Sequence, residues 1–119
     1  MTNTTIPTVV DTYIAAWNET DADRRRSLVG SVWTEDGTYL DPLMSGAGAD
    51  EITAMIGAAQ AQFPGHRFSL VAEPDAHNNV VRFSWTLAAN GAPVAAGQDF
   101  AVVADDGRFR SVTGFLEAV

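Results

Sequence analysis

Asp41 is the residue of this sequence whose surroundings most favour chemistry. It stands in the stretch 38–45 (TYLDPLMS), where a carboxylate is set between large apolar side chains. Pro42 disfavours helical geometry at the residue before it, so Asp41 is predicted to end an extended segment with its side chain able to point inward. A carboxylate in an apolar pocket loses hydration and becomes a better general base. The alternative is an Asp that opens a surface turn, as Asp-Pro pairs often do, and the local sequence leaves both interpretations open.

Two further polar residues stand in apolar surroundings. Tyr13 falls on the apolar face of a predicted helix, where its simplest interpretation is a core aromatic whose hydroxyl finds one partner. Asp99 alternates with two small residues, Gly97 and Ala101, which would leave room above its carboxylate. The opposite phase of the same strand carries Phe100, so the pattern does not decide which face of this strand points inward.

The remaining candidates are two histidines and one arginine. His66 and His77 each stand near the start of a predicted strand, which favours positions at the rim or in solvent, and no set of three metal ligands is spaced for a metal site. Arg82 could pair with Asp99 or with a ligand carboxylate if its side of the strand faced inward. The other side, which carries Phe83, is the better candidate for the core.

The composition limits which functions these residues can serve. The chain has 119 residues, of which 46% are hydrophobic, and this predicts one globular domain over residues 1–119. The formal net charge is −8 and there is no lysine, so the surface is expected to repel nucleic acids and anionic membranes. The absence of cysteine excludes disulfides, thiol catalysis and cysteine-ligated metals. With neither a long apolar run nor a signal-like N-terminal segment, a cytoplasmic location is expected.

Three helices are predicted from apolar residues that recur at spacings of three and four. The first covers residues 6–17. A second, shorter helix directs Leu28 and its apolar neighbours inward and the run Arg24–Arg26 outward, as a solvated face. The third is capped by Asp50 and ends before Pro64 and Gly65.

The second half of the sequence changes to a period of two, which predicts antiparallel strands. With a first strand that precedes the third helix, the predicted strands cover residues 38–43, 66–73, 79–88, 94–104 and 108–117. Asn90-Gly91 predicts a hairpin, residues 35–37 a turn, and residues 45–49 a loop. In the last strand, Phe109 and Phe115 are predicted to share one face.

This order of elements indicates an α+β domain. Three helices from the N-terminal half are expected to cover one face of a curved antiparallel sheet. A curved sheet under helices forms a cone, and the mouth of such a cone is a natural ligand pocket.

Three separated segments, in this order of elements, resemble the nuclear-transport-factor-2-like superfamily, whose fold is cystatin-like, and within it the ketosteroid isomerases and SnoaL-like polyketide cyclases. Residues 9–18 (VVDTYIAAWN) are similar to the first helix of the isomerases, residues 38–42 (TYLDP) to the strand of their general base, and residues 98–100 (QDF) to the strand of their second oxyanion-hole donor. The resemblance covers essentially the whole chain. It implies that Asp41 is the base and that Tyr13 and a protonated Asp99 are the oxyanion-hole donors.

One position departs from the isomerases, because the tyrosine that supports their oxyanion-hole tyrosine falls on Ile56. The pocket is predicted to be walled by large side chains from several elements. These are Trp17, Tyr39, Met44, Ile56, Phe63, Trp85 and Phe115.

The resemblance implies a cofactor-free enzyme that removes a proton next to a carbonyl of a hydrophobic ring or polyketide-like substrate, as an isomerase or a polyketide cyclase does. An epoxide hydrolase-like enzyme, in which carboxylates and Arg82 activate a water, is a second expectation. A module that only binds a small hydrophobic ligand or forms a dimer is a third. Apolar residues in both phases of the sheet also predict a homodimer.

Overall fold

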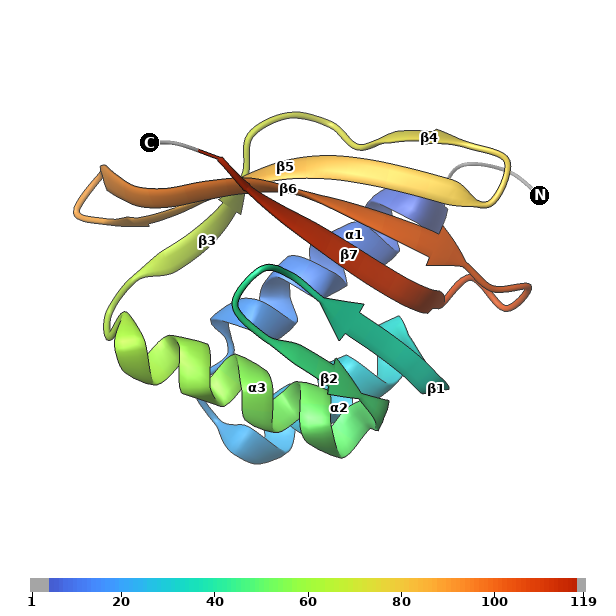
Figure 1. The fold of residues 1–119 in the computed structure, drawn as a ribbon, viewed down its shortest axis with the longest axis horizontal. Coiled ribbons are helices and arrows are strands. Elements are labelled where there is room, and N and C mark those ends of the chain that lie inside the picture. The colour runs from blue at the N-terminus through green and yellow to red at the C-terminus, as the bar shows by residue number, and fades with distance from the viewer. Residues whose placement is uncertain (1–4, 118–119) are drawn as a thin grey trace.

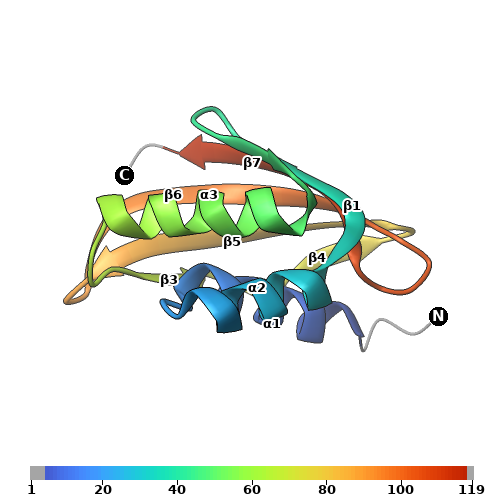
Figure 2. The same cartoon turned by 90° about the horizontal axis from the view of Figure 1, so that it is seen from below.

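The helices of the computed structural model, which describes residues 5–117, all lie on one side of the sheet (Figures 1 and 2). They are α1 (Thr5–Asn18), α2 (Ala22–Val32) and α3 (Gly48–Gln62). The spacing predicted for the first helix is confirmed, because Val10, Tyr13 and Trp17 are buried on one face of α1. No helix in residues 5–117 is long and apolar enough to cross a membrane.

The prediction that the whole run Arg24–Arg26 faces solvent is wrong for Arg25, which is buried. Helical spacing explains the difference, since Arg25 lies four residues before Val29 and shares its inward face. The Arg25 guanidinium donates to the backbone carbonyls of Glu19 and Thr53 and to the side chain of Gln60 on α3. This arginine therefore ties the C-terminal end of α1 to α3.

The strands form one mixed sheet of order β2-β1-β7-β6-β5-β3, with β4 also paired to β5. Their bounds are β1 (Trp33–Leu40), β2 (Ser45–Ala47), β3 (Arg67–Leu70), β4 (Asp75–His77), β5 (Val80–Ala89), β6 (Ala92–Val103) and β7 (Phe109–Glu117). The sheet is not wholly antiparallel as predicted, because β1 pairs with β7 in parallel. In the sheet, the first strand lies beside the last one, so the segment that ends at Asp41 lies next to β7 (Figure 1).

The orientation of β6, which the sequence left open, is inward for Asp99 and outward for Phe100. The prediction for β7 is right only at its start. Phe109 is buried, but the pairing of β6 with β7 shifts register between Val102 and Val103, and after that irregularity Val112 and Gly114 face inward. A register shift of this kind moves the following side chains to the other face, so the expectation that Phe115 faces the interior is wrong.

Several local predictions were confirmed and others need correction. The hairpin at Asn90-Gly91 forms, with positive φ at both residues. Residues 35–37, predicted as a turn, lie inside β1 at an irregularity of its pairing with β7. The predicted loop at 45–49 contains β2, and α3 begins before Asp50, so Asp50 lies in its first turn instead of capping it.

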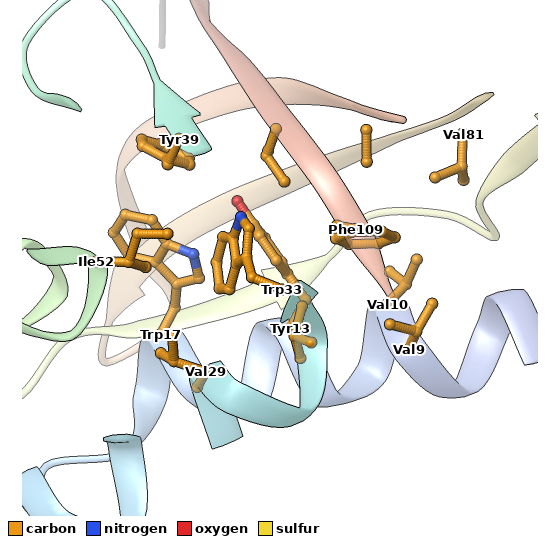
Figure 3. Packing of buried hydrophobic residues seen from close by; sticks show 14 of the residues in the cluster. Val9, Val10, Tyr13, Trp17, Val29, Trp33, Tyr39, Ile52, Val81 and Phe109 are labelled. Atoms are coloured by element: carbon orange, nitrogen blue, oxygen red, sulfur yellow. The ribbon is translucent and has the colours of Figure 1, made fainter. Parts of the chain in front are cut away.

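Aromatic rings fill the core between α1 and the sheet. Tyr13 packs against Trp33, Phe83 and Phe109, with ring centroids 5.1 to 5.9 Å apart. Figure 3 shows Tyr13 rising from α1 beside Trp33, with its hydroxyl directed away from the helix. One wall of the core is fixed by Asn18 at the end of α1, whose side-chain amide bonds both the N–H (2.8 Å) and the carbonyl (2.9 Å) of Phe68 on β3.

Candidate functional site

An apolar cavity of about 120 Å³ lies between α1, α3 and the inner face of the sheet. Most of the predicted site residues line it: Tyr13, Trp17, Tyr39, Asp41, Met44, Phe63, Trp85 and Asp99. A dry cavity of about 150 Å³ in another protein accommodates benzene, so this space suits a small ring, with room for more of a ligand at the open mouth. Among residues 5–117, Asp41 and Asp99 are the only carboxylates that line it.

Asp41 closes the predicted turn and also lines the cavity, while its role as a general base stays a prediction. Its Oδ1 accepts from the backbone N–H groups of Leu43 (2.8 Å) and Met44 (2.9 Å), which close the turn after Pro42. Its Oδ2 accepts from the hydroxyl of Tyr39 at 2.7 Å. A carboxylate has about four lone-pair sites, and three of them are used here, so one site remains for a ligand proton.

Asp99 lies deeper, with only 3% of its surface exposed. Its Oδ2 accepts from the Tyr13 hydroxyl at 2.5 Å, and its Oδ1 accepts from the indole N–H of Trp85 at 3.1 Å. Burial raises the pKa of Asp99 to about 6; the hydrogen bonds from Tyr13 and Trp85 oppose this rise, and the negative charge of Asp41 adds to it. Asp99 therefore takes up a proton at a higher pH than an ordinary aspartate does.

The two tyrosines of the cavity remain protonated hydrogen-bond donors. Burial, followed by the charge of Asp99, raises the pKa of Tyr13 well above its ordinary value. The pKa of Tyr39 is raised by the same two causes, and its hydrogen bond to Asp41 adds to the rise.

Gly114 on β7 marks the point where the polar groups converge. A Cβ atom at Gly114 would lie 2.8 Å from Asp99 Oδ1, 3.1 Å from Tyr39 Oη and 3.2 Å from Asp41 Cβ. The two carboxylates and the Tyr39 hydroxyl thus surround one small space, which a side chain at this position would fill. Because Tyr13 already bonds Asp99, the residues predicted as catalytic come together within the reach of one functional group.

Comparison with known proteins identifies the family. Residues 10–112 match the model of the SnoaL-like domain. The chain belongs to the SnoaL-like family. Its fold also matches a proposed isomerase of this family from Agrobacterium tumefaciens, which is 50% identical over 93% of this chain and 96% of that one, with a TM-score of 0.89.

More distant structures share the fold of this SnoaL-like chain. A proposed polyketide cyclase from Sinorhizobium meliloti is 16% identical, with a TM-score of 0.71 over 96% of this chain and 99% of that one. A protein with a ketosteroid isomerase-like fold from Catenulispora acidiphila, in complex with trimethylamine, is 16% identical, with a TM-score of 0.74 over 91% of this chain and 84% of that one. A comparison with curated proteins found no match.

Two residues predicted to wall the pocket of the SnoaL-like chain lie outside the cavity. Ile56 is fully buried in the core and does not line the cavity, and Phe115 is 54% exposed, with its ring against Phe100 at 5.6 Å between centroids. Arg82 is exposed on the outer face and pairs with Asp75 at 3.0 Å, so it does not reach Asp99. Within residues 5–117 no three histidine, aspartate or glutamate side chains gather as a metal site would require.

The sequence missed part of the polar site. Tyr39 was predicted as a wall residue, but its hydroxyl is the partner of Asp41. Its position two residues before Asp41 in an extended strand, on the same face, could have indicated this contact. The position of the Trp85 indole depends on Gly97, directly opposite on β6, because a Cβ atom there would lie 2.5 Å from the indole ring. Only the register of the two strands reveals this pair, so the sequence could not indicate the Trp85 donor.

Proposed function

We propose that this SnoaL-like protein catalyses the abstraction of a proton next to the carbonyl of a small, ring-bearing hydrophobic ketone. The observation that supports the proposal is the convergence of the Asp41 carboxylate with the Tyr13–Asp99 pair in one otherwise apolar cavity. The family and its structural relatives, a proposed isomerase and a proposed polyketide cyclase, point to the same class of chemistry.

Asp41 is the proposed base. Its free Oδ2 site takes the proton from the carbon next to the carbonyl, and the electron pair of that C–H bond moves to the carbonyl oxygen to form an enolate. In an isomerisation, Asp41 returns the proton to a different carbon. In a ring closure, the enolate carbon attacks a second carbonyl, and the alkoxide that forms takes the proton from Asp41.

Tyr13 and Asp99 are the proposed enolate stabilisers. When Asp99 is protonated, it and the Tyr13 hydroxyl can donate to the developing oxyanion, in a cavity whose low polarity strengthens such bonds. Within residues 5–117, Asp99 Oδ2 bonds Tyr13 alone, so these two donors act as one unit. The enolate oxygen is therefore expected to lie next to the Tyr13 hydroxyl.

Binding without turnover is the second candidate function. The Tyr13 hydroxyl and the Trp85 N–H both donate to Asp99, and a cavity whose donors are paired within the protein fits one that holds a hydrophobic ligand and leaves it unchanged. The epoxide hydrolase-like alternative loses its support, because Arg82 faces away from the cavity.

Deuterium exchange at a simple ketone tests the proposal without knowledge of the natural substrate. The protein is incubated with cyclohexanone in D₂O, and loss of the α-proton signal is followed by NMR. Asp41→Asn is expected to lower the rate by roughly 10²- to 10⁴-fold, the usual contribution of a general base. Binding of 2-naphthol, a planar mimic of an enolate, is expected to change by no more than a few-fold.

Asp11→Asn is the matched control, since Asp11 is an exposed carboxylate on the outer side of α1. It is expected to leave both measurements unchanged. An Asp41→Asn rate within a few-fold of the parent would show that Asp41 is not the base. A parent protein that binds 2-naphthol but exchanges no proton would favour the binding function.

A further inference from the structure

The Tyr39 hydroxyl occupies an unusual place between two carboxylates. It donates to Asp41 Oδ2 at 2.7 Å, and it shares with Asp99 Oδ1 the small space beside Gly114. Tyr39 itself is buried, and its ring packs against Trp17 with centroids 5.4 Å apart. Its position is therefore fixed by the core, and the hydroxyl has little freedom to turn elsewhere.

The carboxylates of Asp41 and Asp99 differ in their exposure and in the hydrogen bonds that they accept. Asp41 is partly exposed and accepts three hydrogen bonds, two of them from backbone N–H groups, which favour its charged form. Asp99 is almost fully buried and accepts two, both from side chains of the cavity wall. Two carboxylates so close resist being charged together, so one of them is the preferred site of a shared proton.

We propose that Tyr39 is a positioning residue that keeps the negative charge of the cavity on Asp41 and leaves Asp99 to take the proton. This inference deepens the proposed function and rests on it for its catalytic meaning, because a base must be charged while its partner donor must be protonated. Tyr39 would thereby make one aspartate, Asp41, the charged base and the other, Asp99, the protonated donor.

The other charged groups of the cavity do not provide this asymmetry. The titratable residues that line it are Tyr13, Tyr39, Asp41 and Asp99, contributed by α1, β1, the turn after β1, and β6. The lining includes no arginine, lysine or histidine among the described residues. Tyr13 donates to Asp99 and so favours charge there, which is the opposite of what the proposed mechanism needs.

Carboxyl-carbon NMR titration of the whole chain tests the inference in the absence of any substrate. Asp41→Asn and Asp99→Asn assign the two signals, and the pH separation of the two titration steps is measured in the parent, in Tyr39→Phe and in Tyr13→Phe. Each tyrosine variant removes one hydroxyl and keeps the ring. Because a hydrogen bond to a charged group corresponds to about one to two pH units, Tyr39→Phe should narrow the separation by that amount.

Tyr13→Phe is the matched comparison, and it should widen the separation because it removes a donor from Asp99. An unchanged separation in Tyr39→Phe, or a change of the same sign in both variants, would overturn the inference. The chain has two tyrosines, so 3-fluorotyrosine incorporated into Tyr13→Phe labels Tyr39 alone, and its ¹⁹F signal should follow the titration of Asp41. A signal that follows Asp99 instead would also overturn it.

The exchange assay separates this inference from the proposed function. With cyclohexanone, Tyr39→Phe should move the acid limb of the rate profile to higher pH, so its rate relative to the parent should fall most on the acid side of the profile. An equal loss of rate at every pH would indicate only a structural role for Tyr39. If the parent exchanges no proton, the proposed function fails, and the NMR titration still decides whether Tyr39 places the charge.

Discussion

Asp41 shows how one side chain can hold a turn and face a cavity together. Its two oxygens have different partners. Oδ1 accepts from the backbone N–H groups of Leu43 and Met44 in the turn, and Oδ2 accepts from the Tyr39 hydroxyl at the cavity wall. The turn thus fixes the direction of the carboxylate, so the atom proposed as the base is held in place before a ligand arrives.

Asp99 should make stability depend on pH. Its pKa is about 6 in the folded protein and close to 3.8 when unfolded, so the folded state gains from its protonated form. This contribution is fully present below about pH 4 and is lost as pH rises through 6, at a cost on the order of 3 kcal/mol. Asp99→Asn stays neutral and should lack this loss.

Urea unfolding at pH 4 and pH 7 measures the difference. Groups away from the cavity titrate alike in both proteins, so the change in unfolding free energy between the two pH values is compared. Asp99→Asn should show a smaller fall in stability toward pH 7 than the parent does. Equal falls in the two proteins would mean that Asp99 titrates like an ordinary surface aspartate.

At the level of single residues, the sequence predicted which residues form the candidate site better than which of them contact one another. Asp41, Tyr13 and Asp99 stood out because each lies among apolar or small residues, and the resemblance to ketosteroid isomerases and SnoaL-like cyclases gave them their expected roles. The hydrogen bond between Tyr13 and Asp99 joins residues 86 positions apart, and no local pattern indicates it. The burial of Ile56 away from the cavity depends in the same way on how α3 packs.

Among the elements, β7 borders the polar end of the cavity because a register shift brings Gly114 to the inner face. Gly114→Ala should press a methyl group into the space shared by Asp99, Tyr39 and Asp41, where the nearest atom is 2.8 Å away. We expect a loss of stability of about 1–3 kcal/mol, as overpacking commonly causes, and at least about tenfold weaker binding of 2-naphthol. Thermal unfolding and fluorescence titration measure the two effects.

Gly30→Ala is the control for Gly114→Ala. Gly30 lies in α2, where an added Cβ would approach no nearer than 3.6 Å to the Arg26 guanidinium. Alanine favours a helix over glycine by up to about 1 kcal/mol, so this variant should be as stable as the parent or more stable. If both variants bind 2-naphthol as the parent does, the space beside Gly114 has no part in ligand binding.

The long elements were predictable and the short ones were not. The three helices and the strands from β5 to β7 extend over enough residues for a period to be visible. All six were predicted, and the first and third helices and these strands were predicted close to their bounds. β2 and β4 have three residues each, too few for any period. The parallel pairing of β1 with β7 depends on the path of the whole chain, and the irregularities of β1 and β7 interrupt the alternation on which strand prediction rests.

For the whole molecule, we propose a homodimer formed through the outer face of the sheet. Phe100, Phe115 and Val80 are exposed on the outer side of neighbouring strands, and an apolar face of this kind usually marks an interface. Light scattering at micromolar concentration should therefore give twice the chain mass of 12.7 kDa.

Phe100→Arg combined with Phe115→Arg should reduce the mass to that of one chain by placing charge on this face. Val71→Arg is the control, since Val71 is exposed in the connection between β3 and β4, beyond the strands of this face. A parent protein that scatters as a 12.7 kDa particle would refute the dimer, and a dimer that survives the double substitution would place its interface elsewhere.

The two hydrogen bonds between the Asn18 side chain and the Phe68 backbone also affect how this sheet can pair with other chains. By bonding the N–H and the carbonyl of Phe68, the Asn18 amide takes the place that a further strand would occupy beside β3. The other two edge strands, β2 at the opposite margin and β4 beside β5, offer only three residues each to an incoming strand. Growth of the sheet by edge-to-edge pairing, the first step toward fibrillar aggregation, is thus hindered at these edges. The residue that holds the cavity wall thus also covers part of a sheet edge.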